Sequence, residues 1–299
     1  MVKNPRPTEW HDQPMLIAPF DPWNSKLCTC PPKLTLNPYT GCAHGCLYCY
    51  VSSYVPDFYH PRPKTNLISK LEREAGKLKG ELVSIANSSD PYPPIEQTLG
   101  LTRKCLQTLS RHHCKLQLIT KSPIVTRDID ILKKTRCTVA MTIITEDDKL
   151  AKILEPHAPP SSNRLNAVRK LLQESVPTSV RIDPLIPSLN HQPYKLVKML
   201  ASMGVSHVTC STYKVKPDNW RRITQAFPVL AKSLGPQYFE KGERIGRSLY
   251  LPRNTRRELL ENVKKLAEEE GMKFSSCREG FPGLNSATCD GSWLIQDSD

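Results

Sequence analysis

The stretch NPYTGCAHGCLYCY, residues 37–50, places three cysteines within eight positions, at Cys42, Cys46 and Cys49. Their spacing is C-x3-C-x2-C, and no fourth cysteine follows close behind. A structural zinc ion would require a fourth ligand, and His44 lies between two of the cysteines, where it is badly placed to bind the same ion. A cubane iron–sulfur cluster takes one thiolate per iron, so three thiolates leave one iron open. The loop therefore predicts a [4Fe-4S] cluster held by three cysteines.

The open iron separates a reactive centre from a structural one, because a vacant metal position can accept a further ligand. Gly41 and Gly45 stand beside the cysteines. We expect the backbone to approach the cluster closely at these two positions, because glycine has no side chain. The loop is thus interpreted as a site of metal-centred chemistry.

Short apolar runs alternate with amphipathic stretches along most of the chain. This rhythm indicates βαβ units, a parallel sheet and right-handed crossovers. The strands are expected at residues 33–38, 81–87, 115–121, 137–144, 178–186 and 206–212, with helices at 101–113, 128–135, 162–175 and 194–204. Ser161 or Ser162 is expected to cap the third of these helices. Such a set of strands suits a partial (β/α)6 TIM-type barrel better than a doubly wound sheet, and in both folds functional groups lie at the carboxyl ends of the strands.

The rhythm breaks after residue 215. We expect helices at 218–230 and 255–272, a basic loop or hairpin at 235–254, and an irregular tail at 273–295 that carries two cysteines. The predicted fold class is α/β, a partial barrel with a mainly helical, cysteine-containing C-terminal extension over the barrel mouth. The expected domains are an N-terminal segment with a C-x-C motif at 1–32, the barrel core at 33–215 and the basic extension at 216–299.

The composition limits the class of protein. The 299-residue chain is 38% hydrophobic and carries 42 Lys and Arg against 29 Asp and Glu, a formal net charge of +13. It has no uncharged apolar run long enough to cross a bilayer, and its first residues lack the apolar core of a signal peptide. Eleven cysteines without an export signal argue against a disulfide framework and favour metal ligands or reactive thiols. The sequence therefore predicts a cytoplasmic protein with no membrane partner.

The segment CAHGCLYC resembles the signature of the radical S-adenosylmethionine (SAM) enzymes, including an aromatic residue, Tyr48, just before the last cysteine. The resemblance implies a [4Fe-4S] cluster on the three loop cysteines, with the amino and carboxylate groups of SAM on the open iron. It implies that a one-electron donor drives cleavage of SAM to a 5′-deoxyadenosyl radical, which abstracts hydrogen from the substrate. The implied fold is a partial (β/α)6 barrel, in agreement with the strand pattern.

A closer resemblance covers about residues 33–190, to the spore photoproduct lyase-like branch, also called DNA repair photolyases. The segments SSDPYPPIE, LITKSP, TIITEDD and EPHAPPSSNRLNAVRKL are similar to that branch and stand in the same order. By this likeness Ser89 and Asp90 would hold the amino end of the methionine moiety, and Lys121 and Thr142 would contact the rest of the cofactor. Each position falls at the carboxyl end of an expected strand. The alternatives are turn formation for the Ser-Asp-Pro bend and a solvated amine for Lys121.

The chain departs from spore photoproduct lyase at one position. In that enzyme a cysteine three residues before the matching aspartate returns a hydrogen atom to the product radical, and here the position is Asn87. An amide cannot donate a hydrogen atom as a thiol does. Tyr48 and Tyr50 resemble the tyrosine pair of that enzyme and are the candidate catalytic residues. We therefore expect a related radical reaction on a different substrate.

Four further cysteines lie near the two ends of the chain, in LCTCPPK and in the tail. They have the number of ligands that a second iron–sulfur cluster or a zinc ion needs, and a disulfide within the C-x-C pair would be strained. Because the termini of a barrel domain often meet, one metal site could join them. The alternative is four unrelated thiols or a redox-labile pair. The candidate ligands are Cys28, Cys30, Cys277 and Cys289.

Cationic and aromatic side chains are concentrated in the C-terminal extension. Cations neutralise phosphates and aromatic faces stack on bases, so this mixture favours nucleic acid as a partner, either a single strand or an unstacked nucleotide. The alternative is a solvated helix surface, which the mixed charges at 255–270 favour for that helix. The cations are Arg221, Arg222, Lys241, Arg244, Arg247, Arg253, Arg256 and Arg257, and the aromatic residues are Trp220, Tyr238, Phe239 and Tyr250.

Three functions remain open on the sequence. The first is a radical SAM enzyme that repairs or modifies nucleic acid. The second is a radical SAM enzyme that modifies a protein or a small metabolite, with a basic extension that recruits an anionic partner. The third is a non-catalytic iron–sulfur or zinc module that binds nucleic acid or passes electrons. The first is the function that the sequence predicts.

Overall fold

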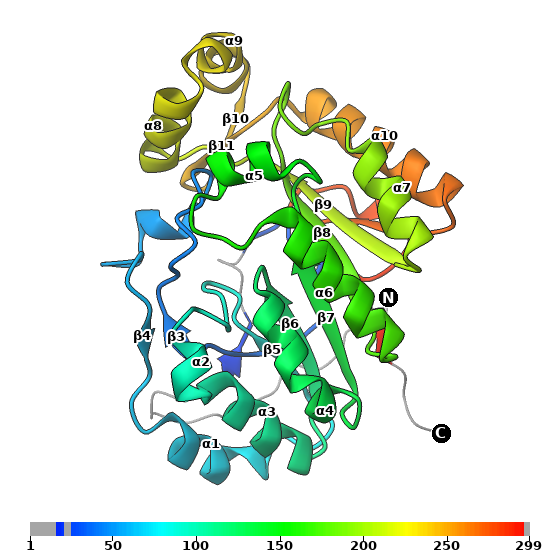
Figure 1. Cartoon of the computed structure of the whole chain (residues 1–299). Coiled ribbons are helices and arrows are strands. Elements are labelled where there is room, and N and C mark those ends of the chain that lie inside the picture. Colours follow the sequence, from blue (N-terminus) through cyan, green and yellow to red (C-terminus); the bar gives the residue numbers. More distant parts are fainter. Residues whose placement is uncertain (1–15, 21–24, 296–299) are drawn as a thin grey trace.

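The computed structural model describes residues 16–20 and 25–295, and these form one central sheet of eight strands (Figure 1). The strand order is β1-β2-β5-β6-β7-β8-β9-β12. β1 and β2 are antiparallel, whereas all other neighbouring strands of this sheet are parallel. The strands are β1 (Ala18–Pro19), β2 (Leu34–Leu36), β5 (Leu82–Ile85), β6 (Lys115–Thr120), β7 (Cys137–Thr142), β8 (Thr178–Leu185), β9 (His207–Thr212) and β12 (Lys273–Ser276).

The expected strands are confirmed as β2 and β5–β9. The sheet is an open, partial barrel, because its edge strands β1 and β12 do not pair with each other in the described part of the chain. Every residue of β7 is buried, as happens when both faces of a parallel sheet are covered. The predicted α/β class with a partial barrel is thereby confirmed.

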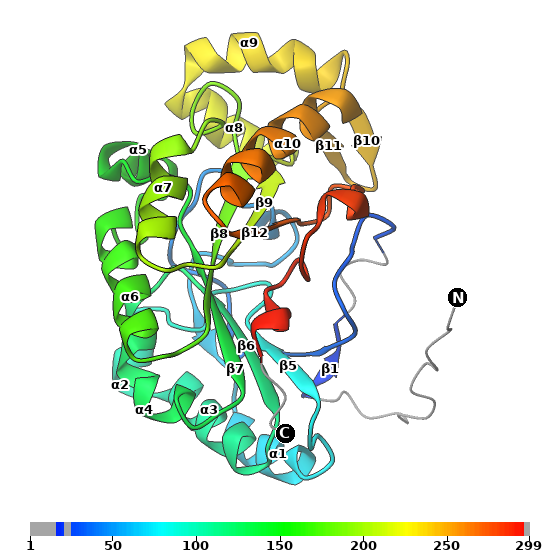
Figure 2. The same cartoon turned by 90° about the vertical axis from the view of Figure 1, so that its right-hand side faces the viewer.

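Helices cover one face of the sheet, and the described N-terminal segment before β2 and the tail after β12 run along the other face (Figure 2). Apolar side chains of the strands and of α1, α3, α6, α7 and α10 form the main core. None of the helices that the structure describes is both long and apolar enough to span a membrane. The helices are α1 (Leu67–Ala75), α2 (Glu96–Leu99), α3 (Leu101–Arg111), α4 (Ile129–Leu132), α5 (Asp148–Leu154), α6 (Ser161–Gln173), α7 (Tyr194–Ser202), α8 (Pro217–Ala226), α9 (Pro228–Phe239) and α10 (Arg253–Glu269), with the 3-10 turns η1 (Val51–Ser53), η2 (Pro123–Asp128), η3 (Pro282–Leu284) and η4 (Ser292–Leu294).

Two expectations about the helices are wrong in detail. The helix expected at 218–230 is split into α8 and α9, because Pro228 has no backbone N–H to donate and disfavours helical geometry at Phe227. No serine side chain caps α6, since Ser161 is already its first helical residue. The backbone N–H of Ser162 instead donates to the carboxylate of Asp148 at 2.9 Å, so the preceding helix supplies the acceptor.

The C-terminal extension contributes a strand to the same sheet as the barrel core. β10 (Glu243–Ile245) and β11 (Ser248–Tyr250) form a hairpin inside the expected range 235–254, but α9 extends to Phe239 and α10 begins at Arg253. The expectation of an irregular tail is wrong for Lys273–Ser276, which form β12 and pair in parallel with β9. Two serines in this short stretch hide the apolar pattern of a buried strand. The sheet therefore continues past residue 215, and the division at 1–32, 33–215 and 216–299 stays a prediction.

The tail after β12 is held against the sheet by buried polar contacts. The Asp290 carboxylate accepts a hydrogen bond from Lys33 Nζ at 2.6 Å, and the Asp290 carbonyl accepts one from Gln117 on β6. Thr209 Oγ1 on β9 donates to the carbonyl of Cys289 at 3.0 Å. The tail thus lies beside the N-terminal segment on the face of the sheet that the helices leave open (Figure 2).

His207 offers a test of this tail packing. Its ring is buried, contacts Trp293 edge to face with ring centres 5.9 Å apart, and is paired through Nε2 with Ser275 at 3.1 Å. Burial, with a smaller contribution from Arg181, lowers the pKa of His207 from 6.5 to about 4. Between these values the unfolded chain binds more protons than the folded chain, so the free energy of unfolding decreases as the pH falls.

We expect His207→Gln to remove about 3 kcal/mol of the stability difference between neutral pH and pH ~4. Urea unfolding of the wild-type and variant proteins at several pH values in this window measures the effect. His191→Gln, at a partly exposed histidine, serves as the control for the substitution itself. An identical pH dependence in the wild type and in His207→Gln would contradict the burial of the neutral ring.

Candidate active site

Polar and sulfur-bearing side chains gather in a pocket at the carboxyl ends of β5–β9. The cysteine loop borders this pocket and follows β3 (Tyr39–Thr40), which pairs with β4 (Arg62–Pro63) in a separate small sheet. The pocket has about 980 Å³ that no protein atom fills, a volume that includes its open mouth. It brings together all the residues predicted for the cluster, for SAM and for catalysis: Cys42, Cys46, Cys49, Ser89, Asp90, Lys121, Thr142, Tyr48 and Tyr50.

The thiols of the cysteine loop fit a metal cluster. None of them is in a disulfide. Burial raises the pKa of all three, that of Cys46 to about 12, so a thiolate here needs a compensating positive charge. The backbone N–H of His44 is directed at the Cys42 sulfur, and that of Ser52 is directed at the Cys49 sulfur. Backbone donors around buried sulfurs suit thiolates whose charge a metal neutralises.

The two glycines of the cysteine loop make room for protein groups. Gly41 has φ +89°, and a Cβ there would lie 2.6 Å from the carbonyl oxygen of Phe58. Gly45 has φ +65°, and a Cβ there would lie 2.8 Å from the ring of His157. Packing against Phe58 and His157 therefore gives both positions a reason to be glycine, and close approach of the backbone to a cluster stays a prediction.

The carboxylate of Glu155 is the centre of a buried charged group behind the cysteine loop. It accepts a hydrogen bond from the Tyr48 hydroxyl and pairs with Arg164 at 2.6 Å, while Lys121 Nζ lies 3.8 Å away. Burial alone would raise the pKa of Glu155, but Arg164 and Lys121 hold it below its usual value. Arg164 also donates to the carbonyl of Thr142 at 3.1 Å. The group thus joins the cysteine loop to the end of β7.

Neither Glu155 nor Arg164 is predicted from the sequence as a site residue. Both lie in the segment EPHAPPSSNRLNAVRKL, and a signal for them is the pairing of an acidic and a basic residue in a stretch that resembles a known family. The alternative that Lys121 is a solvated amine is wrong. Its side chain is 17% exposed, and its Nζ lies 5.7 Å from the centre of the Tyr48 ring.

Asp90 connects three parts of the site. Its carboxylate accepts hydrogen bonds from Thr120 Oγ1 at 2.8 Å and from the backbone N–H groups of Tyr92 at 2.9 Å and Lys121 at 2.8 Å. His44 Nδ1 of the cysteine loop lies 3.7 Å from it. The bond to Tyr92 is the turn interaction that the sequence offers as an alternative, so Asp90 shapes the turn and also borders the pocket.

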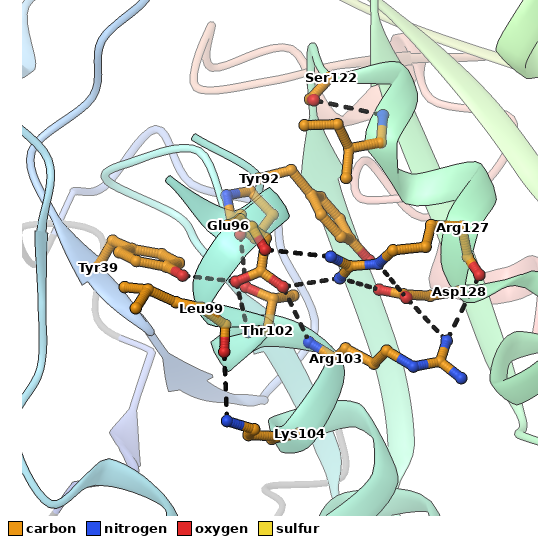
Figure 3. Close-up of polar contacts among 12 residues, drawn as sticks. Tyr39, Tyr92, Glu96, Leu99, Thr102, Arg103, Lys104, Ser122, Arg127 and Asp128 are labelled. Atoms are coloured by element: carbon orange, nitrogen blue, oxygen red, sulfur yellow. Dashed lines mark hydrogen bonds and ion pairs between the residues drawn. The ribbon is translucent and has the colours of Figure 1, made fainter. Parts of the chain in front are cut away.

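The loop that carries Ser89 is anchored through the carboxylate of Glu96 (Figure 3). Ser89 Oγ donates to the carbonyl of Tyr39 at 3.0 Å, and the Tyr39 hydroxyl donates to Glu96. Glu96 also accepts a hydrogen bond from the backbone of Thr102 at 2.9 Å and pairs with Arg127 at 2.7 Å. Figure 3 shows these groups converging on the buried carboxylate, which fixes the loop after β5 relative to the start of the cysteine loop.

Three charged residues that are not predicted from the sequence also line the pocket: Arg181 and Asp183 of β8, and Lys214 two residues after β9. Arg181 pairs with Asp183 at 2.7 Å, and Lys214 pairs with Glu279 at 2.9 Å. Burial would raise the pKa of Asp183, but Arg181 and Lys214 lower it to about 2. Asp183 and Lys214 lie near the carboxyl ends of predicted strands, and this position is the signal that could have identified them.

Asn87 and Tyr50 line the pocket together with these groups. Asn87 Nδ2 donates to Thr35 Oγ1 at 2.8 Å, and Asn87 Oδ1 accepts from Ser84 Oγ at 2.9 Å, so the amide is fixed by β2 and β5. The Tyr50 hydroxyl accepts a hydrogen bond from Arg278 at 3.3 Å. A catalytic role for Tyr48 and Tyr50 stays a prediction.

Arg222 joins the extension to the cysteine loop. From α8, its guanidinium donates to the carbonyls of Leu47 at 3.1 Å and Cys49 at 2.7 Å and pairs with Asp218 at 3.0 Å. Apolar residues of α8 and α9 pack in the same cluster as Cys46. Arg222 is therefore engaged in holding the loop and is not a free surface cation.

The exposed basic surface is smaller than the sequence suggests. Arg256 is fully buried and pairs with Glu279 at 3.1 Å and Glu243 at 3.0 Å, because its position on α10 faces the core. Tyr238 and Tyr250 are also buried, so they cannot stack on bases. The expected cations that are exposed are Arg221, Lys241, Arg244, Arg247, Arg253 and Arg257, and Phe239 is an exposed aromatic residue.

The structure also brings the four remaining candidate metal ligands together. The sulfurs of Cys30 and Cys289 are 3.3 Å apart, Cys28 contacts Cys30, and Cys277 contacts Cys289. In residues 16–20 and 25–295, no three His, Cys, Asp or Glu side chains are already arranged as ligands of a single metal ion. A cluster on the cysteine loop does not require such an arrangement, because each iron takes its own thiolate.

The model of the Radical SAM superfamily matches residues 36–200, which is more than half of the chain. An uncharacterized protein of Methanocaldococcus jannaschii is 30% identical over 164 residues, and one of Acidianus two-tailed virus is 29% identical over 197 residues. These matches cover 52% and 58% of this chain and 62% and 64% of the two relatives. The chain thus spans less than two thirds of the length of these relatives.

Two solved structures illustrate the fold. A spore photoproduct lyase mutant with bound AdoMet and dinucleoside spore photoproduct has a TM-score of 0.62 at 16% identity, over 84% of this chain and 78% of that one. Streptococcus suis SuiB bound to precursor peptide SuiA has a TM-score of 0.56 at 15% identity, over 84% and 50%. The family match includes the whole cysteine loop and β5–β8, and β9 lies beyond its end. The chain belongs to the Radical SAM superfamily.

Proposed function

We propose that this protein is a radical SAM enzyme that repairs or modifies nucleic acid. The observation that carries the enzymatic part is the pocket itself, which three cysteines of one loop line together with polar residues at the ends of β5, β6 and β7. In barrels of this kind, the carboxyl ends of the strands are where substrates and cofactors bind. The basic extension beside this end supports an anionic substrate.

The side chains fit the cofactors that the family implies. Cys42, Cys46 and Cys49 would hold a [4Fe-4S] cluster. When bound there and reduced by a one-electron donor, the cluster and SAM supply a carbon-centred radical that can abstract hydrogen from a substrate. The protein's own part is to bury the thiols, to hold the loop through Glu155 and Arg222, and to limit access of water. The residues that would border SAM are Ser89, Asp90, Lys121 and Thr142.

The substrate is proposed to differ from spore photoproduct. Asn87 stands where a hydrogen-donating cysteine would be expected, and both polar ends of its amide are engaged with neighbouring strands. All eleven cysteines are free of disulfides, which supports a reducing compartment such as the cytoplasm.

A second candidate function, modification of a peptide or small metabolite, is supported by the fold shared with SuiB bound to its precursor peptide.

The enzymatic proposal is tested by anaerobic reconstitution with iron and sulfide, reduction with dithionite and assay for 5′-deoxyadenosine. We expect slow formation of 5′-deoxyadenosine without substrate, and faster formation when nucleic acid is added. No formation under either condition would favour the non-catalytic iron–sulfur or zinc module. Formation that peptides or metabolites accelerate and nucleic acid does not would favour the second candidate.

Binding to nucleic acid is expected to depend on exposed cations of α8 and the β10–β11 hairpin. These elements lie at the same end of the molecule (Figure 1). Each cation that neutralises a phosphate releases counterions, so binding should weaken as salt rises. Replacing Arg221, Arg244 and Arg247 with glutamate should weaken binding about tenfold or more and reduce the salt slope by about three units.

Fluorescence anisotropy with a labelled single strand at several salt concentrations measures this effect. The matched control reverses three exposed lysines far from the extension, Lys77, Lys79 and Lys134, with the same change in net charge. The control should keep most of the affinity. Equal losses in the two triple variants would mean that overall charge, and not this surface, governs binding.

A further inference from the structure

A second group of thiols lies where the two ends of the chain meet. Cys28 and Cys30 come from the N-terminal segment, Cys277 follows β12, and Cys289 lies in the tail. The sulfurs of Cys30 and Cys289 are 3.3 Å apart. Cys28 contacts Cys30, and Cys277 contacts Cys289, so the four thiols form a continuous row. A further link between these segments is the hydrogen bond from Asn285 to Thr29 at 3.3 Å.

The distance between the two central sulfurs favours one metal ion over a second cluster. A tetrahedral zinc ion with bonds of about 2.3 Å holds its sulfurs about 3.8 Å apart. A cubane would place each thiolate on a different iron and therefore farther from the next. The 3.3 Å contact between these two metal-free thiols is nearer to the first distance than to the second. In the described residues, the side chains are not arranged around a single metal position. The cysteine side chains must therefore rotate to bring the four sulfurs around the ion.

Positive groups and backbone donors surround these sulfurs. The backbone N–H of Cys30 is directed at the Cys28 sulfur, and the Arg181 guanidinium interacts with the Cys277 sulfur. Lys33, whose side chain is 1% exposed, stands beside Cys30. A tetrathiolate zinc site carries a net negative charge, which cations and N–H donors of this kind stabilise.

We propose that Cys28, Cys30, Cys277 and Cys289 bind one zinc ion, separate from the cysteine loop that would hold the cluster. The ion would tie the N-terminal segment to the tail on the face of the sheet that the helices leave uncovered (Figure 2). Its role would be structural, because four protein ligands leave no open position for a substrate. Through Arg181, which also lines the pocket, it would fix one part of the pocket wall.

The test measures zinc and iron in full-length protein purified without oxygen. We expect about one zinc per chain in addition to about four irons, and four sulfurs at about 2.3 Å in zinc X-ray absorption of the wild type. The double variant Cys277→Ala/Cys289→Ala should lose the zinc and keep the iron. The triple variant with alanine at Cys42, Cys46 and Cys49 should lose the iron and keep the zinc.

The control is Cys105→Ala/Cys114→Ala, which removes two buried thiols elsewhere and should keep both metals. If the tail double variant does not fold, the wild-type absorption spectrum still decides, because it reports the ligands directly. About eight irons without zinc would overturn the proposal in favour of a second cluster. Metal-free protein with a Cys30–Cys289 disulfide, or zinc retained in the tail double variant, would also overturn it.

Discussion

Replacing Glu155 with glutamine is expected to lower the free energy of unfolding by about 3 kcal/mol or more and to reduce cluster loading. The change keeps the shape of the side chain but removes its charge. Arg164 is then left buried without its partner, which lies at 2.6 Å in the wild type, and Lys121 loses its nearest carboxylate. Removing one member of a buried ion pair is costly because the other charge stays out of water.

Urea unfolding of the metal-free protein measures this loss, and iron content after reconstitution measures the effect on the loop. Glu174→Gln is the matched control, because Glu174 pairs with Lys133 at 2.8 Å on the surface, and its loss should cost less than about 1 kcal/mol. Equal destabilisation by Glu155→Gln and Glu174→Gln would contradict the role given to the buried group.

The loss of stability in Glu155→Gln should also depend on pH. The pKa of Glu155 is held below its ordinary value of 4.5, so its stabilising effect is complete above that value. As the pH falls below 4.5 and through the lower pKa of the folded state, the carboxylate is protonated and the effect is lost. The stability difference between the wild type and Glu155→Gln should therefore be constant near neutral pH and shrink in acid.

Cys46→Ala is expected to abolish SAM cleavage, with 5′-deoxyadenosine falling at least about a thousandfold, to background. Cys46 is the central cysteine of the loop, and among the described residues that line the pocket the only other thiols are those of the two remaining loop cysteines. Two thiolates cannot hold a cubane as three do, so iron content should fall in parallel. The variant removes little volume, and the fold should survive.

Cys105→Ala is the control for this variant, because Cys105 is a fully buried cysteine of α3 that does not line the pocket. It should keep iron and activity. Iron content and 5′-deoxyadenosine are measured on the same reconstituted samples, with circular dichroism to confirm folding. Unchanged iron and activity in Cys46→Ala would remove the assignment of the loop as the cluster site.

The parallel core was predictable because its signal is local. β7 is a run of six buried residues between two helical stretches, and the same rhythm repeats along residues 81–212. β12 was not predictable in this way, since Lys273–Ser276 have few apolar residues and are stabilised by pairing with a distant strand. The break between α8 and α9 was readable from Pro228 and was missed.

The site was predictable where the residue type itself determines the chemistry. Cysteines at C-x3-C-x2-C spacing and polar residues at strand ends are visible in the sequence, and the structure places them in one pocket. The sequence does not show which of its charged residues are buried. Arg256 and Arg257 are neighbours in sequence, yet the first is fully buried in an ion-pair network and the second is exposed. Glu155 was missed for the same reason, because its importance depends on charges that come from other elements.

Electron paramagnetic resonance of the anaerobic, dithionite-reduced protein, recorded with and without SAM, tests the central claim most directly. A cluster with one iron open to SAM should give a reduced spectrum whose shape changes when SAM is added, and Cys46→Ala should give no such spectrum. A cluster spectrum that is identical with and without SAM would contradict a SAM-binding iron in this pocket.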